Sequence, residues 1–267
     1  MAFALPYTGE LLLVLALITI GSICGLIGGV ILLWNEKLVR KIAHVLVSFA
    51  AGVLLSAAFL DLMPESIEMT SWAWLSCLVG IIFFFVSERA LIWHSHVHHE
   101  NHIKEHVRTY SDSPKKAFGL LLMLGDTIHN FVDGMIIAAA AIISIKLGIL
   151  TAIAVFFHEI PQEIGDFSVL IYAKFPRAKV FLYNFYSALA SFVGGLAVFF
   201  LASTEIIENL SPLLAFAAGG FIYIAVSDLL PELKHETRSI KEVLIHLVVL
   251  IFGIALIFLL GQFLHAH

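Results

Sequence analysis

The feature that most constrains this sequence is a series of long apolar runs separated by short polar connections. A helix that crosses a bilayer needs about 20 mostly apolar residues, and eight runs of the 267-residue chain reach that length. They cover residues 10–34, 42–63, 72–93, 117–143, 147–172, 180–202, 212–231 and 242–264. The runs are continuously apolar rather than alternating, which favours helices over a membrane β-barrel. The sequence therefore predicts an all-α membrane protein with eight transmembrane helices in a single domain, residues 1–267.

The composition agrees with a membrane protein. Charged residues make up 13% of the chain, about half the usual share of about 25% in a soluble protein. The formal net charge of −5 gives no indication of nucleic-acid binding. The two cysteines, Cys24 and Cys77, lie inside apolar runs, so neither a disulfide scaffold nor a CxxC metal site is expected.

Basic residues predict the orientation of the helices. Cytoplasmic loops of membrane proteins carry an excess of Lys and Arg, and 14 of the 15 basic residues fall on every second connection. These connections are the segments 34–41, 89–116, 174–179 and 234–241. The remaining basic residue, Lys146, lies on the other side. Both termini are then non-cytoplasmic, and the long connection 94–116 is a cytoplasmic loop.

Two segments of the chain read alike, FAAGVLLSAAFLDLMPE at 49–65 and FAAGGFIYIAVSDLLPE at 216–232. In the predicted orientation they run in opposite directions, which is typical of inverted-repeat transporters. Asp61 and Asp228 are then expected at two cation-attracting mouths, one near each membrane surface. The alternative is that these acidic groups are solvated helix ends beside a proline kink.

Ionisable side chains gather in the fourth and fifth predicted helices, although a charge at the centre of a membrane helix costs about 2.5–3.5 kcal/mol. They are Asp126, His129, Asn130 and Asp133 in LGDTIHNFVDG, and His158, Glu159, Gln162, Glu163 and Asp166 in FFHEIPQEIGDF. His129 and Asp133 are four residues apart and share a helix face, and the same spacing joins His158 to Gln162. Counting from the helix starts places both histidines near the membrane midplane.

Two overlapping sets of ligands follow from this spacing. The first is His129, Asp133, His158 and Gln162, and the second is Asn130, Asp133 and Glu159 with Glu163 or Gln162. Imidazole and carboxylate ligands suit zinc and other first-row divalent ions. The sequence therefore predicts transport of Zn²⁺, with Fe²⁺, Mn²⁺ and Cd²⁺ as alternative substrates and no resident cofactor. For any single histidine, a hydrogen-bonded packing role is the alternative.

Two other function classes are alternatives to transport. His158 and Glu159 begin like the HExxH motif of zinc proteases, which makes an intramembrane metalloprotease one alternative. The fifth position of that motif is Gln162, and Pro161 interrupts the helix, so an enzyme is not expected. A metal-binding membrane sensor without transport is the other alternative.

The motifs HNFVDG and HEIPQEIGDF strongly resemble those of the Zrt/Irt-like (ZIP) family of divalent metal transporters. The likeness covers nearly the whole chain and is greatest to the subfamily whose fifth helix reads HExPHExGD. It implies a 3+2+3 arrangement of helices, uptake toward the cytoplasm, and a mononuclear or binuclear site between helices four and five. The resemblance transfers a primary site to His129, Asp133, His158 and Gln162, and an adjacent site to Asn130, Asp133, Glu159 and Gln162. Gln162 departs from the His or Glu of relatives, so Glu163 is expected to take a larger role.

The long connection is rich in histidine and reads HSHVHHENHIKEH over residues 94–106. Such tracts commonly bind metal, and the alternative is a solvated linker without a role. The histidines concerned are His94, His96, His98, His99, His102 and His106.

Three further expectations concern the surroundings of the site. Asp126 and Asp166 are expected along the path of metal release. The spacing of Gly21, Gly25 and Gly29 predicts either a homodimer through the first helix or close packing inside the bundle. The expected location is a plasma (inner) membrane, with an organelle membrane as the alternative.

Overall fold

The computed structural model is all-helical in the part of the chain that it describes, residues 7–102, 113–201, 207–231, 233 and 239–265. Seven of its helices are long and apolar enough to cross a membrane. An additional shorter apolar stretch, Ala73–Ser87, begins the helix α5 and corresponds to the predicted span 72–93. The prediction of an all-helical membrane fold is therefore confirmed.

Several of the spans consist of more than one helical segment. The first contains α1 (Tyr7–Ile18), the turns η1 (Thr19–Ile23) and η2 (Cys24–Leu26), and α2 (Ile27–Trp34). The second contains α3 (Glu36–Ser56), the π-helical turn η3 (Ala57–Leu62) and α4 (Met63–Met69). The others are α5 (Ala73–His102), α6 (Ser113–Ile143), α7 (Ile145–Tyr172), α8 (Arg177–Ala188) with α9 (Ala190–Leu201), α10 (Ile207–Tyr223) with the π-helical turn η4 (Ile224–Leu229), and α12 (Ile240–His265).

The helices that flank the long connection extend beyond the predicted spans. α5 continues to His102, and α6 begins at Ser113, so both ends of the predicted loop 94–116 are helical. Hydropathy shows where a helix stops being apolar. It does not show where the helix ends.

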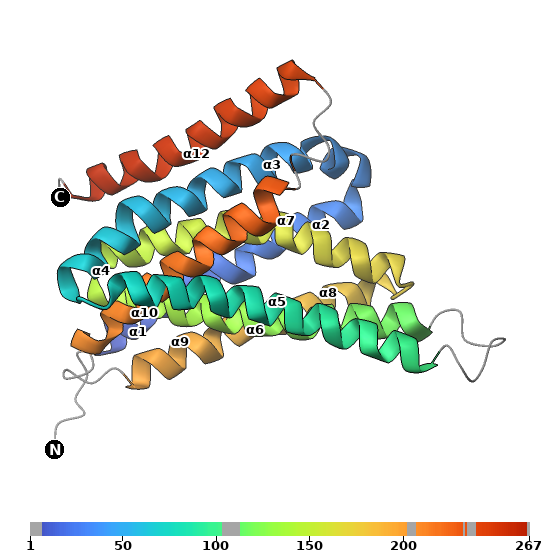
Figure 1. The fold of residues 1–267 in the computed structure, drawn as a ribbon, viewed down its shortest axis with the longest axis horizontal. Coiled ribbons are helices and arrows are strands. Elements are labelled where there is room, and N and C mark those ends of the chain that lie inside the picture. The colour runs from blue at the N-terminus through green and yellow to red at the C-terminus, as the bar shows by residue number, and fades with distance from the viewer. Residues whose placement is uncertain (1–6, 103–112, 202–206, 232, 234–238, 266–267) are drawn as a thin grey trace.

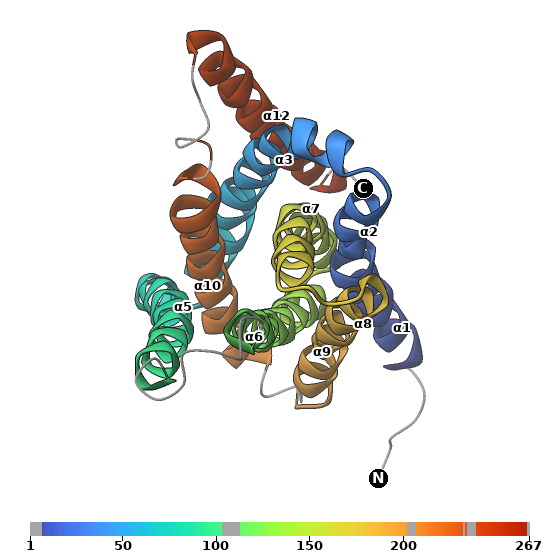
Figure 2. The ribbon, with the colours of Figure 1, turned by 90° about the vertical axis from the view of Figure 1, so that its right-hand side faces the viewer.

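Helix α7 lies at the centre of the bundle, with α2, α3, α6 and α8 around it (Figure 2). α5 packs mainly against α10, and α12 packs mainly against α3, so both lie at the edge of the bundle. The start of α1 and the end of α12 lie at the same end of the bundle (Figure 1). The polar residues of α7 are consequently enclosed by protein on most sides.

The glycines of the first span allow α7 to approach closely. A methyl group added at Gly25 would lie only 2.5 Å from the Cβ atom of Glu159. Gly21 faces Ile137 and Val155 in the same way. These glycines therefore pack inside the bundle, which is the second of the two outcomes predicted for them.

Candidate metal centre

The fourth and fifth spans lie side by side because a single residue connects them. Ser144 alone separates the end of α6 at Ile143 from the start of α7 at Ile145. His129 lies 14 residues before the end of α6, and His158 lies 13 residues after Ile145. At about 1.5 Å per residue, the two histidines stand at nearly the same height along the antiparallel pair.

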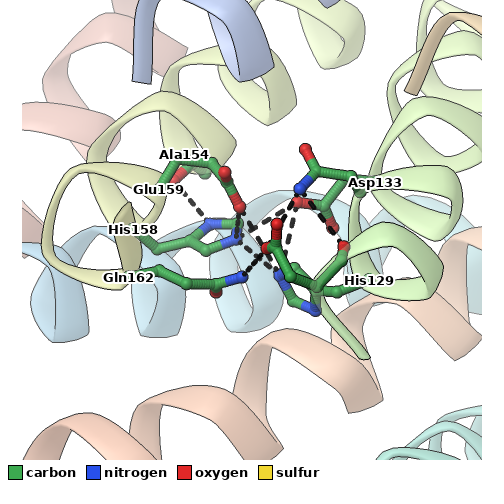
Figure 3. A network of polar contacts seen from close by, with 8 residues as sticks. His129, Asp133, Ala154, His158, Glu159 and Gln162 are labelled. Carbon is green, nitrogen blue, oxygen red and sulfur yellow. Dashed lines mark hydrogen bonds and ion pairs between the residues drawn. The ribbon is translucent and has the colours of Figure 1, made fainter. Parts of the chain in front are cut away.

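Four side chains from these two helices converge on one point (Figure 3). One nitrogen or oxygen atom from each of His129, Asp133, His158 and Glu159 lies within 4.8 Å of the others. The Nε2 atoms of His129 and His158 are 3.2 Å apart. Asp133 Oδ2 is 3.5 Å from the first of these nitrogens and 3.2 Å from the second. Glu159 Oε1 is 3.7 Å and 3.5 Å from the same two nitrogens.

These separations fit one tetrahedral metal ion. Zinc binds imidazole nitrogen and carboxylate oxygen at about 2.0–2.2 Å, so neighbouring ligands of a regular tetrahedron stand about 3.3–3.6 Å apart. Five of the six separations that such a tetrahedron has, from 3.2 to 3.7 Å, lie close to that range. The spacing of the four side chains is thus compatible with two nitrogen and two oxygen ligands of one ion.

Hydrogen bonding orients His158 for this role. Its Nδ1 atom lies 3.2 Å from the backbone oxygen of Ala154. A carbonyl can only accept, so Nδ1–H is the donor, and the lone pair of the neutral ring is then on Nε2, which faces the cluster. Metal-binding histidines usually have their second nitrogen fixed in this manner.

The carboxylates of the cluster are enclosed without compensating donors. The side chains of Asp133 and Glu159 are 1% and 0% exposed. Neither oxygen of either group has a hydrogen-bond partner among the described residues. Burying an unpaired charge is costly unless a counter-charge is present, so a cation is a partner that suits this arrangement. His129 is 13% exposed and is the most accessible of the four.

The amide residues predicted as ligands have other partners. Gln162 Nε2 donates to Asp126 Oδ1 over 3.0 Å, and Asn130 Nδ2 donates to the same oxygen over 3.1 Å. Among acidic and histidine side chains, the structure groups Glu159 with His129, Asp133 and His158. Gln162 and Asn130 hold Asp126 beside the cluster.

The remaining predicted residues differ in how deeply they are buried. Glu163 is fully buried, and neither of its oxygens has a partner in the described part of the chain. Asp166 is 6% exposed and lies within electrostatic range of Asp126 and Glu163. Asp61 is half-buried at the junction of α3 and α4, whereas Asp228 is exposed. The histidine side chains of residues 94–106 lie outside the part that the structure describes.

The sequence did not predict the aromatic wall of the site. The ring of Phe84 on α5 lies 5.9 Å from the ring of His129, edge to face. Phe221 on α10, which is 1% exposed, lies 5.9 Å from His158. Both phenylalanines stand among other apolar residues of their helices, so their residue type alone does not indicate that they face the site.

Comparison with known proteins decides the family. Residues 9–117 and 92–261 match the family described as "ZIP Zinc transporter". The chain belongs to the ZIP zinc transporter family. It is therefore an integral multi-pass membrane protein of a family of transporters rather than enzymes, and the protease alternative loses its support.

Individual ZIP proteins show the same relationship. The chain is 31% identical over 219 residues to Zinc transporter ZIP13 of Pongo abelii, covering 75% of this chain and 62% of that protein. It is 29% identical over 274 residues to the Zinc transporter ZIP13 homolog of Drosophila melanogaster, covering 81% and 76%. Zinc transporter ZIP10 of Homo sapiens is 36% identical over 156 residues, which is 56% of this chain but 18% of that protein. The chain thus spans less than two thirds of the length of some of these relatives.

Proposed function

We propose that this protein transports divalent transition-metal ions, zinc first among them, across a membrane toward the cytoplasm through the cluster on α6 and α7. The observation that carries the proposal is the convergence of His129, Asp133, His158 and Glu159, with ligand atoms within 4.8 Å of one another, at a buried position. The names of the ZIP relatives support zinc as the first substrate. Fe²⁺, Mn²⁺ and Cd²⁺ are the alternative substrates, because imidazole and carboxylate ligands accept them as well.

The proposed orientation rests on the distribution of basic residues. With 14 of 15 Lys and Arg residues on alternate connections, both termini face away from the cytoplasm. α1 begins and α12 ends at the same end of the bundle (Figure 1). This arrangement supports an even number of membrane crossings. We propose a plasma (inner) membrane as the location, with an organelle membrane as the alternative.

The proposed mechanism is alternating access between two inverted halves in a 3+2+3 arrangement. The repeated segments share more than their sequence, because each contains a π-helical turn in the same place. η3 covers Ala57–Leu62 and η4 covers Ile224–Leu229. The two turns are 167 residues apart, which is also the distance between the two repeated segments. Each turn comes just before a proline, Pro64 or Pro231, which lacks the N–H that a regular helix needs. This match supports an internal repeat in which both halves bend at equivalent points.

The proposed route passes Asp61, the cluster, and then Asp126 and Asp166. Asp126 precedes His129 by three residues on α6, and Asp166 follows His158 by eight residues on α7. In the proposed orientation both acids lie on the cytoplasmic side of the cluster. The set Asn130, Asp133, Glu159 and Gln162, with Glu163 nearby, is the proposed place for a second ion if the site is binuclear. The histidines of residues 94–106 are proposed to receive released metal.

The test is metal uptake by the purified protein in liposomes. Entry of Zn²⁺, Fe²⁺, Mn²⁺ and Cd²⁺ is measured for the wild type and for His129→Ala/His158→Ala. The matched control is His44→Ala/His246→Ala, because these two histidines also pair within the bundle, with ring centroids 6.4 Å apart, but lie on α3 and α12. Loss of entry in the first variant alone supports the proposal. Equal entry in all three proteins contradicts the site, and no entry in any of them favours a metal sensor.

A further inference from the structure

One half-buried carboxylate outside the metal cluster stands beside a basic side chain. Asp61 lies in the π-helical turn η3, and its Oδ2 atom is shielded from solvent without a hydrogen-bond partner in the described ranges. Its Oδ1 atom lies 3.2 Å from the point where a side chain on Gly261 of α12 would begin. A side chain at Gly261 would therefore crowd this carboxylate.

Lys146 reaches the same space from a third element. It is the second residue of α7, and its Cε atom lies 3.9 Å from the same point beside Gly261. The methyl group of Leu150, a fully buried residue one turn later on α7, lies 3.7 Å from that point and forms an apolar wall. Lys146 Cε and Asp61 Oδ1 thus lie near the same point beside Gly261, and Lys146 attracts Asp61 electrostatically.

The location of this pair relates it to the metal cluster. Lys146 and His158 lie on the same helix, 12 residues apart, which is a distance of about 18 Å along α7. Lys146 is also the one basic residue of 15 that falls on the non-cytoplasmic side of the proposed topology. An ion that enters from this side therefore meets a carboxylate that already faces a positive charge.

We propose that Lys146 is a specificity-determining residue at the entrance, a tethered cation that competes with incoming ions for Asp61. This inference rests on the proposed function. Coulomb attraction grows with the charge of the ion, so a divalent ion displaces the ammonium group more readily than a sodium ion does. The pair then admits divalent metal to the route while it disfavours monovalent cations.

The experiment measures zinc uptake into liposomes as a function of zinc concentration, with and without added sodium. Lys146→Gln is expected to lower the KM for zinc by up to about fivefold, the upper end of what one partly exposed charge interaction contributes. The rate at saturating zinc is expected to stay the same, and inhibition by sodium is expected to increase. Lys146→Arg retains the charge and is expected to behave like the wild type.

A double variant separates pairing from a general effect of surface charge. In the Asp61→Asn background, the further change Lys146→Gln is expected to leave the KM unaltered, because the competing partner is gone. A KM of Lys146→Gln equal to that of the wild type, or a drop that persists in the Asp61→Asn background, would overturn the inference while wild-type transport stands. No zinc uptake by the wild type would overturn the proposed function and this inference together.

Discussion

The Nε2 atoms of His129 and His158 lie 3.2 Å apart, although the two residues belong to different helices. This separation is close to the edge of a tetrahedron around a zinc ion, about 3.3–3.6 Å. Two neutral imidazoles at this distance direct at least one lone pair toward their neighbour. The two nitrogens can share one N–H···N hydrogen bond, or both lone pairs can point at a cation placed between the rings and the carboxylates of Asp133 and Glu159.

Replacing one buried carboxylate should raise the stability of the metal-free protein and reduce the stabilisation that zinc provides. In Glu159→Gln the shape is kept, but a charge without a hydrogen-bond partner in the described structure is removed. The metal-free variant should gain about 1–3 kcal/mol of stability, and its stabilisation by added zinc should shrink, because a ligand has been lost. Thermal unfolding with chelator and with zinc measures both effects. Glu10→Gln, at an exposed position on α1, is the control, and a fall in the stability of metal-free Glu159→Gln would contradict this account.

Gln162 is expected to affect metal affinity less than the four clustered residues do. Its amide donates to Asp126 over 3.0 Å, so Gln162→Ala removes a support of Asp126 and leaves the cluster intact. Zinc affinity of this variant, measured by isothermal titration calorimetry, should fall less than about tenfold. A tenfold loss is the smallest typically seen when a residue that hydrogen-bonds a metal ligand is replaced. Asp133→Ala is expected to fall much further. Equal losses in the two variants would make Gln162 a direct ligand.

Much of the fold and of the site could be predicted from residue spacing alone. The apolar runs gave the spans, and the four-residue spacing of His129 and Asp133 gave half of the cluster. The partner of Gln162 could not be predicted, because helical spacing says which residues share a face but not how two helices rotate toward each other. The meeting of Asp61, Lys146 and Gly261 was also out of reach, because it joins three elements far apart in the sequence.

Close packing between the first span and α7 makes Gly25 sensitive to substitution. A methyl group there would lie 2.5 Å from Glu159 Cβ, so Gly25→Ala should lower stability by about 1–3 kcal/mol through overpacking. It should also weaken zinc binding, because Glu159 is displaced. Gly165→Ala is the matched control on α7, where nothing lies within 4 Å of the added methyl. That change should stabilise the helix by up to about 1 kcal/mol, and a stable, zinc-binding Gly25→Ala protein would contradict the packing described.

Zinc binding should weaken as the pH falls. Imidazole must be neutral and carboxylate ionised to bind a metal, so binding releases protons, and added protons shift the equilibrium toward the metal-free protein. Zinc affinity measured between about pH 7.5 and 5.5 should decrease, with a shallower slope in His129→Ala, which has one proton fewer to lose. A slope that is unchanged in this variant would show that His129 does not bind the metal.

The central claim is that His129, Asp133, His158 and Glu159 bind the transported ion, and zinc-edge X-ray absorption tests it most directly. The purified protein loaded with one equivalent of zinc is compared with His129→Ala/His158→Ala. The account predicts four nitrogen and oxygen ligands at about 2.0–2.2 Å in the wild type, including the scattering pattern of two imidazoles. That pattern should be lost in the double variant. A six-oxygen shell in the wild type, or the same imidazole signal in both proteins, would contradict the claim.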